Sequence, residues 1–227
     1  MEITAEKIMQ QLSAGTQVAG VIVVFGEEGY YKDKIAAALP RAVFGDAAPE
    51  DREITVFERD TDIKEISAAV NTYPFFSGRS LVIIKDEKLW GGKDGGEKRK
   101  QQQEELAELL ADVPEHCQVL LLGEKIDKRG KLYKSLLKTA AMVECKSLKS
   151  YQLKPWLDEQ AALRGCRFDY EASQTIMEYL SVTDNAPLLL LEQEIEKLSV
   201  YAGERKIWTK DDIEQTFAAL PEVSRFA

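Results

Sequence analysis

The strongest constraint on the fold is a regular alternation of short apolar runs and helical stripes over residues 1–145. A continuous apolar run of about four to eight residues is typical of a strand buried on both faces of a parallel sheet. Such runs occur at residues 18–25, 54–57, 80–84, 118–122 and 142–145. The pattern predicts an α/β fold with a five-stranded parallel sheet, whose strands are joined by right-handed helical crossovers.

The helices expected between and after these strands set the domain organisation. Before residue 146, apolar spacing predicts helices near residues 8–12, 30–39, 63–70, 106–113 and 131–139, and Pro40 should end or bend the second of them. After residue 146 the strand signal disappears, and four helical stripes remain. We therefore expect an α/β domain at 1–147, a small all-α domain at 148–221, and the start of a linker to a further domain at 222–227.

Composition and charge exclude several classes of protein. The net charge of −9 argues against a free-standing nucleic-acid binder, because such affinity comes largely from basic charge against phosphate. No apolar run approaches about 20 residues, and the first residues do not form a secretory signal, so no membrane contact is expected. Three widely spaced cysteines fit reduced thiols. The single histidine, His116, is next to Cys117, but the further ligands that a zinc site needs are lacking, and we interpret it as a solvated turn residue.

The junction after the first strand has the spacing of a P-loop but not its chemistry. A G-x-x-x-x-G-K-[ST] motif beginning at Gly26 would place its lysine at Lys32, which is present. Tyr31 replaces the second glycine, and Asp33 replaces the hydroxyl that binds magnesium. Glu27 and Glu28 add negative charge at the place where phosphates would bind. Either this is a degenerate P-loop or Lys32 is in register by chance; both interpretations predict no nucleotide hydrolysis and no cofactor.

Aromatic residues cluster in the connection before the third strand. Tyr73, Phe75 and Phe76 fall within four residues, next to Pro74 and before Ser77 and Gly78. Their spacing is not that of a helix or strand facing a core. They either pack beneath their own loop or form the centre of a protein interface, where aromatic anchors commonly dominate binding.

A basic cluster accompanies the helix expected at 131–139. It contains few acids, and its members are Lys125, Lys128, Arg129, Lys131, Lys134 and Lys138. Such a cluster is either a solvated face or a contact with a neighbouring subunit or with DNA.

Five segments occur in the order in which a known family carries them. They read FGEEGYY at 25–31, YPFFSGRSLVIIK at 73–85, DKRGKLYK at 127–134, VECKSLK at 143–149 and EIEKL at 194–198. The chain thereby resembles the delta subunit of the bacterial DNA polymerase III clamp loader. The resemblance implies an AAA+-like fold with P-loop-type sheet topology, in which a third domain builds an oligomeric collar.

The resemblance also implies a function and a set of partners. The expected role is a non-catalytic subunit that binds the β sliding clamp and helps to open it for loading onto primed DNA. The expected partners are the tau/gamma ATPase subunits, delta prime and, within the assembled complex only, primer-template DNA. The complex belongs to the DNA polymerase III holoenzyme, a DNA-directed DNA polymerase (a nucleotidyltransferase). The expected location is the cytoplasm, at the nucleoid-associated replisome, and no catalytic residue, cofactor or metal is expected in this chain.

The same resemblance places a clamp-binding wedge in the aromatic connection. The wedge would comprise Asn71, Thr72, Tyr73, Pro74, Phe75 and Phe76, with the three aromatic side chains as apolar anchors. This sequence has Tyr and Phe where aliphatic residues are often found in the family.

Two other functions stay open on the sequence. One is a nucleotide-dependent AAA+ or P-loop switch, or an ATPase with an aberrant phosphate loop. The other is a signalling or scaffold α/β domain unrelated to replication.

Overall fold

The computed structural model describes residues 1–16, 18–85, 87–90, 96–181 and 188–217. The chain forms two compact units, unit 1 at Met1–Lys146 and unit 2 at Ser147–Ala227, and each is described by itself. The predicted linker at 222–227, like the last residues of the predicted helical domain, lies outside the described residues.

Unit 1 is built on a parallel sheet, which confirms the predicted α/β class. Its strand order is β1-β6-β2-β5-β4-β3, and every pairing is parallel. The strands are β1 (Glu2–Ile3), β2 (Val21–Phe25), β3 (Glu53–Phe57), β4 (Ser80–Ile84), β5 (Cys117–Gly123) and β6 (Ala141–Glu144). Among the described residues of unit 1 the sheet has six strands, where five were predicted. The additional strand, β1, has two residues, which are too few to show any periodicity, and only its pairing with β6 defines it.

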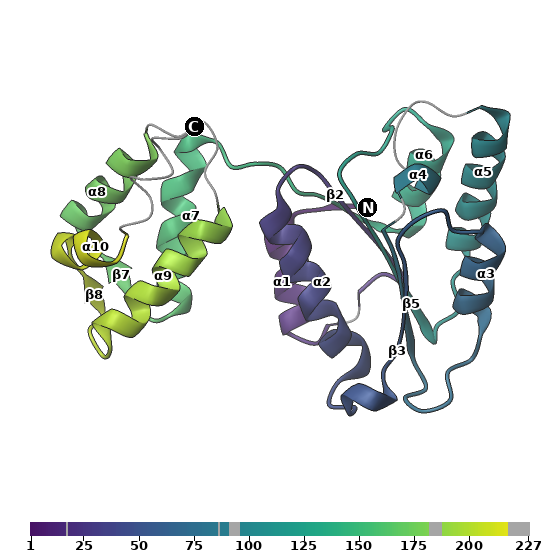
Figure 1. Cartoon of the computed structure of the whole chain (residues 1–227), viewed down its shortest axis with the longest axis horizontal. Coiled ribbons are helices and arrows are strands. Elements are labelled where there is room, and N and C mark those ends of the chain that lie inside the picture. Colours follow the sequence, from purple (N-terminus) through teal and green to yellow (C-terminus); the bar gives the residue numbers. More distant parts are fainter. Residues whose placement is uncertain (17, 86, 91–95, 182–187, 218–227) are drawn as a thin grey trace. The chain divides into compact units, whose positions relative to one another are not determined.

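Helices cover both faces of this sheet (Figure 1), with α1 and α2 on one face and α3, α5 and α6 on the other. Their bounds are α1 (Ala5–Ser13), α2 (Gly29–Phe44), α3 (Ile63–Asn71), α4 (Glu87–Trp90), α5 (Glu97–Ala111) and α6 (Lys131–Thr139). A short 3₁₀ turn, η1 (Pro49–Asp51), precedes β3. Strands β2 and β4 are buried along their whole length, as expected of strands with helices on both sides.

Helix α2 corrects one prediction. Pro40 was expected to end or bend the helix after residue 39; it does not end it, since it lies inside α2, which continues to Phe44. A proline in a helix interior costs about 3 kcal/mol, because it removes a hydrogen bond and its ring meets the preceding turn. Val43 and Phe44 follow it and are buried. Each buried side chain of this size contributes about 1.5–3 kcal/mol, so the last turn offsets the cost of the proline.

Unit 2 contains four helices among its described residues. They are α7 (Ser150–Leu163), α8 (Tyr170–Leu180), α9 (Leu188–Ala202) and α10 (Lys210–Thr216). The predicted stripe of α9 is confirmed, since Leu188, Leu191, Ile195 and Leu198 are all fully buried. The expectation of an all-α unit is wrong in one detail: β7 (Arg167–Phe168) and β8 (Ile207–Trp208) pair in parallel. These two-residue strands carry no alternation that a sequence pattern could reveal.

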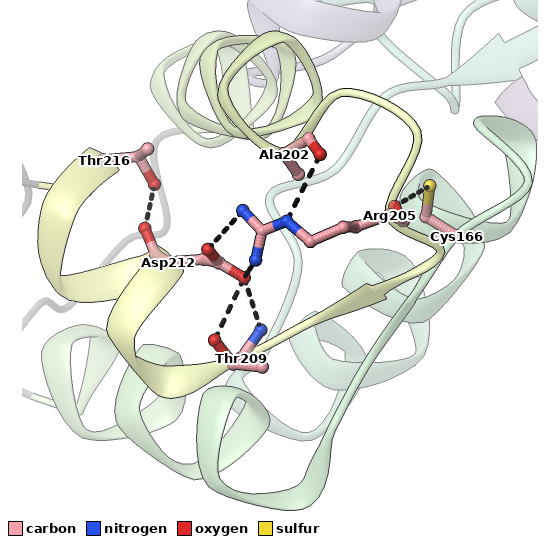
Figure 2. Close-up of polar contacts among 6 residues, drawn as sticks. All are labelled: Cys166, Ala202, Arg205, Thr209, Asp212 and Thr216. Carbon is pink, nitrogen blue, oxygen red and sulfur yellow. Dashed lines mark hydrogen bonds and ion pairs between the residues drawn. The ribbon is translucent and has the colours of Figure 1, made fainter.

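A polar network around Asp212 joins the end of α9, β8 and the start of α10 (Figure 2). Arg205 donates to the Asp212 carboxylate at 2.9 Å, and the backbone N–H of Thr209 does so at the same distance. The Thr209 hydroxyl donates to the same carboxylate at 3.0 Å, and the bond from the Thr209 backbone N–H belongs to the predicted capping box. Burial favours the neutral carboxyl, but the bonds from Arg205 and Thr209 outweigh it and lower the pKa of Asp212. The network therefore holds an ionised carboxylate inside unit 2.

None of the helices in the described ranges combines the length and apolar character needed to span a bilayer.

Candidate functional site

The predicted aromatic site lies at the edge of the unit 1 sheet where the strands begin, here called the amino edge. The connection from α3 to β4, residues 72–79, is called the aromatic loop. Register pairs Glu53 with Ser80 and Ser80 with Cys117, so the first residues of β3, β4 and β5 lie side by side. The aromatic loop enters β4 between its two neighbours, at the lower edge of unit 1 in Figure 1.

The three aromatic side chains of the loop face solvent. Tyr73 is 68% exposed, Phe75 89% and Phe76 74%. Pro74, between them, is buried. The rings are thus not part of the core of unit 1, and Pro74 is the residue that attaches the loop to it. Exposing two phenylalanines side by side removes the stabilisation that their burial would give, which is about 1.5–3 kcal/mol for each.

Two side-chain hydrogen bonds mark the end of α3, where the aromatic loop begins. The Asn71 side-chain amide donates to the Ser67 carbonyl at 2.8 Å, and the Thr72 hydroxyl donates to the Ala68 carbonyl at 2.7 Å. Both bonds are made to carbonyls of the last helical turn, and the Ala68 carbonyl also accepts the backbone N–H of Thr72 at 3.0 Å. Pro74 disfavours helical geometry at Tyr73, so the helix ends here. Of the six predicted wedge residues, Asn71 is the last residue of α3 and Thr72 is its cap.

A carboxylate from another strand holds the tip of the loop. The Glu53 Oε1 atom accepts the backbone N–H of Phe75 at 2.5 Å and that of Phe76 at 3.2 Å. Ionised acceptors form the stronger hydrogen bonds in proteins. The backbone that carries both phenylalanines is therefore fixed to the beginning of β3.

A second contact comes from the segment before β5. The rings of Tyr73 and His116 lie 5.1 Å apart, centre to centre, at 60°. Such edge-to-face pairs contribute about 0.5–1.5 kcal/mol. His116 was predicted to be a solvated turn residue, but it is half-buried and its carbonyl accepts the N–H of Ser80. Through this carbonyl and its ring it contacts both the start of β4 and the loop.

Gly78 provides the turn back into the sheet. Its φ is +65°, a left-handed conformation that glycine adopts without strain. The Ser77 hydroxyl spans the same turn by donating to the Arg79 carbonyl at 2.8 Å. The loop is thus tied at both ends and at its tip.

The opposite, carboxyl edge of the sheet contains the P-loop-like junction. Lys32 Nζ donates to the Gly26 carbonyl at 2.8 Å, within its own junction. The Glu28 carboxylate accepts the N–H of Tyr30 at 2.8 Å and caps α2. The lysine and the Tyr30 N–H of the helix N-terminus, which are of the kind that hold phosphates in a working P-loop, are both engaged by groups of this chain.

In the same junction, the backbone of Gly26 lies very close to that of Cys145. Gly26 has φ +132°, and a Cβ there would lie 2.0 Å from the Cys145 carbonyl oxygen. That carbonyl accepts the N–H of Glu28 at 3.1 Å. The Cys145 thiol is buried, and burial raises its pKa to about 12, so it is not a nucleophile at neutral pH.

The predicted basic cluster is partly neutralised within the protein. Glu144 accepts from Lys128 at 2.7 Å and lies 3.1 Å from Lys146. Burial favours the neutral form of Glu144, but the two lysines outweigh this effect and lower its pKa. Lys131 pairs with Glu104 at 2.9 Å. Lys125, Arg129, Lys134 and Lys138 are exposed.

Comparison with known protein families identifies the family of this chain. A family model described as "DNA polymerase III, delta subunit" matches residues 23–146, more than half of the chain. The chain belongs to this family.

Individual relatives agree with that assignment. The DNA polymerase III subunit delta of Bacillus subtilis (strain 168) is 28% identical over 213 residues, covering 92% of this chain and 60% of the relative. The solved Bacillus subtilis DNA clamp loader delta protein (YqeN) matches with a TM-score of 0.74 at 24% identity, over 93% of this chain and 61% of that one. The chain thus spans about three fifths of the length of these delta proteins.

A more distant solved structure shares the fold alone. A chain of the E. coli MS115-1 HORMA:CdnC:Trip13 complex matches with a TM-score of 0.52 at 14% identity, over 97% of this chain and 85% of that one.

Two residues of the candidate site in this member of the delta-subunit family, Glu53 and His116, were not predicted from the sequence. Glu53 is 22 residues before Phe75, and nothing in the pattern around it links the two. His116 was interpreted as a solvated turn residue and was not linked to the aromatic loop. A general signal was available, since the first residues of neighbouring parallel strands must lie together at one edge of a sheet. Among the described residues no group of His, Cys, Asp and Glu is arranged to hold a metal ion.

Proposed function

We propose that this chain is the clamp-binding part of a clamp-loader delta subunit, and that the aromatic loop is its contact with the β sliding clamp. Family membership supplies the class of protein. The observation that carries the proposal is the exposure of Tyr73, Phe75 and Phe76 on a loop whose backbone is fixed. A rigid, exposed group of aromatic rings is what an interface needs in order to fill a pocket on a partner.

The binding energy would come from placing these rings in an apolar pocket. Aromatic anchors in desolvated pockets cost about 2 kcal/mol or more each when truncated. Since the loop backbone is already ordered, less conformational entropy is lost on association than for a flexible loop. A subunit that binds the opened clamp more tightly than the closed ring shifts the ring toward the open form.

We further propose that ATP chemistry resides in partner subunits of the tau/gamma type, assembled with delta prime. The bond of Lys32 to Gly26 and the capping of α2 by Glu28 support this division, because both phosphate-binding features are already occupied. The exposed lysines and arginine of the basic cluster would contact primer-template DNA only in the assembled complex. A chain of net charge −9 has little attraction for DNA by itself.

Titration of the chain with purified β clamp tests the proposal. We expect saturable binding with one chain per clamp pocket, measured by calorimetry or surface-immobilised clamp. A ring-opening assay, with a fluorescent pair across one clamp interface, should report separation of the pair as the chain is added. Absence of any saturable binding at high micromolar chain concentration would overturn the assignment of the loop and leave only the family membership.

A further inference from the structure

The Glu53 carboxylate lies outside the predicted wedge yet contacts its tip. One oxygen accepts two successive backbone N–H groups, those of Phe75 and Phe76, at 2.5 Å and 3.2 Å. Successive amides that converge on one anion form a concave backbone arrangement, a nest, with a defined conformation. An ionised carboxylate is an acceptor only, so it suits a position surrounded by donors.

This contact fixes the direction of both phenylalanine side chains. The N–H groups can point to one oxygen only if the peptide planes before residues 75 and 76 keep a particular orientation. The Cα–Cβ bonds of the two residues follow from those planes. Both rings, 89% and 74% exposed, are held outward by a bond made on the backbone, not by packing of the rings themselves.

Glu53 is itself well placed to act as an anchor. It is the first residue of β3 and pairs in register with Ser80, where the loop ends. The preceding residue, Arg52, donates from Nε to the Ala47 carbonyl at 2.9 Å, which fixes the entry to the strand. On the other side of the loop, His116 contacts the ring of Tyr73.

We infer that Glu53 is a positioning residue of the clamp-binding site, and that affinity for the clamp depends on its carboxylate although the carboxylate need not touch the clamp. The inference rests on the proposed function. If the binding conformation of the loop is populated only in part, the apparent affinity falls by that fraction. Without Glu53, the two N–H groups bond to water and the loop tip samples other conformations.

The experiment compares three variants of the full chain for β clamp binding. Glu53→Ala removes the acceptor of both N–H groups, and we expect about tenfold weaker binding, a change that corresponds to about 1.4 kcal/mol. Glu53→Gln keeps an acceptor oxygen at the same reach and should restore most of the affinity. Glu58→Ala is the matched control: this glutamate follows the other end of β3, is exposed, and pairs with Lys85. It should bind like the parent.

A second readout separates positioning from general stability. In amide-proton NMR, the signals of Phe75 and Phe76 should move upfield in Glu53→Ala and return toward the parent positions in Glu53→Gln, while the thermal midpoint changes little. Unchanged clamp binding by Glu53→Ala would overturn the inference, provided that Phe75→Ala/Phe76→Ala weakens binding in the same assay. If the phenylalanine variant also binds like the parent, the proposed function fails instead.

Discussion

The two edges of the unit 1 sheet have opposite characters. At the carboxyl edge, the groups that could receive a ligand bond to one another: Lys32 to the Gly26 carbonyl, Glu28 to the start of α2, and Glu144 to two lysines. At the amino edge, polar groups also pair within the chain, and these contacts fix the loop whose three aromatic rings are exposed to solvent.

In this α/β sheet the surface available to a partner is at the amino edge, and the phosphate-binding type of site at the carboxyl edge is closed. Ligands of open α/β sheets generally bind at the carboxyl ends of the strands. Here that edge is closed by the chain's own side chains, and the exposed apolar surface lies at the other end of the same strands. Polar contacts within the chain occur at both edges, so what differs is whether they leave a surface available to a partner.

The largest expected effect is on clamp binding at the amino edge. Replacing Phe75 and Phe76 together with alanine should weaken binding by about 4 kcal/mol, roughly a thousandfold, because two anchors of about 2 kcal/mol each are lost. Titration calorimetry measures the change. Since both rings are exposed in the free chain, the thermal midpoint should stay near that of the parent.

A matched control uses aromatic residues of similar exposure in unit 2. Tyr151 and Tyr170 are 73% and 77% exposed, so Tyr151→Ala/Tyr170→Ala removes comparable surface elsewhere. It should leave clamp binding unchanged. A phenylalanine variant that melts far below the parent would show instead that the rings support the fold, and the comparison of the two edges would lose its basis.

The next largest effect is on stability at the carboxyl edge. Gly26→Ala places a Cβ 2.0 Å from a backbone oxygen of Cys145 at φ +132°, so the junction must move. We expect a loss of about 3 kcal/mol in the free energy of unfolding of unit 1, typical of forced backbone strain. Hydrogen–deuterium exchange should show faster exchange in β2 and β6.

Gly29→Ala is the control for this substitution. Its added Cβ meets nothing within 4 Å, and Gly29 is the first residue of α2. Alanine is favoured over glycine in helices by about 1 kcal/mol, so this variant should be as stable as the parent or slightly more stable. Equal behaviour of the two variants would contradict the tight junction described here.

A smaller, pH-dependent effect is expected from Glu144. The folded state lowers the pKa of Glu144, so its contribution to stability is present above the ordinary glutamate pKa of about 4.3 and is lost as the pH falls through the lowered value. Glu144→Gln should therefore destabilise unit 1 at pH 7 by at most about 1 kcal/mol, given the partial exposure of the pair. Urea unfolding at pH 7 and near pH 3 measures this. A difference that persists undiminished at the lower pH would contradict the ion-pair assignment.

The smallest expected signal is from nucleotide. Calorimetry with Mg-ATP should show no saturable heat into the millimolar range, because Lys32 and the N-terminus of α2 are engaged within the chain. A micromolar dissociation constant would show that these contacts open readily. It would restore the nucleotide-dependent switch as a function for this chain.

Much of the fold could be predicted because apolar runs and helical stripes report burial directly. The runs at residues 80–84 and 118–122 fall on β4 and β5, and the stripe at 131–139 matches α6. The three two-residue strands could not be predicted, since β1, β7 and β8 exist only through their pairing with distant segments. That the helix continues past Pro40 could not be predicted for a related reason, because burial of the residues after it outweighs a local preference.

The sequence alone determined the class of fold and, through five ordered motifs, the resemblance to the delta-subunit family. It also determined the positions of the aromatic loop and of the defective P-loop. Each of these depends on residue types at short spacing. The tertiary structure decided which contacts these segments make: Lys32 bonds to Gly26, Glu53 reaches the loop from the start of β3, and His116 from the segment before β5. The contacts of Glu53 and His116 with the loop depend on strand order and register, which bring together residues 22 to 43 positions apart and which no local pattern encodes.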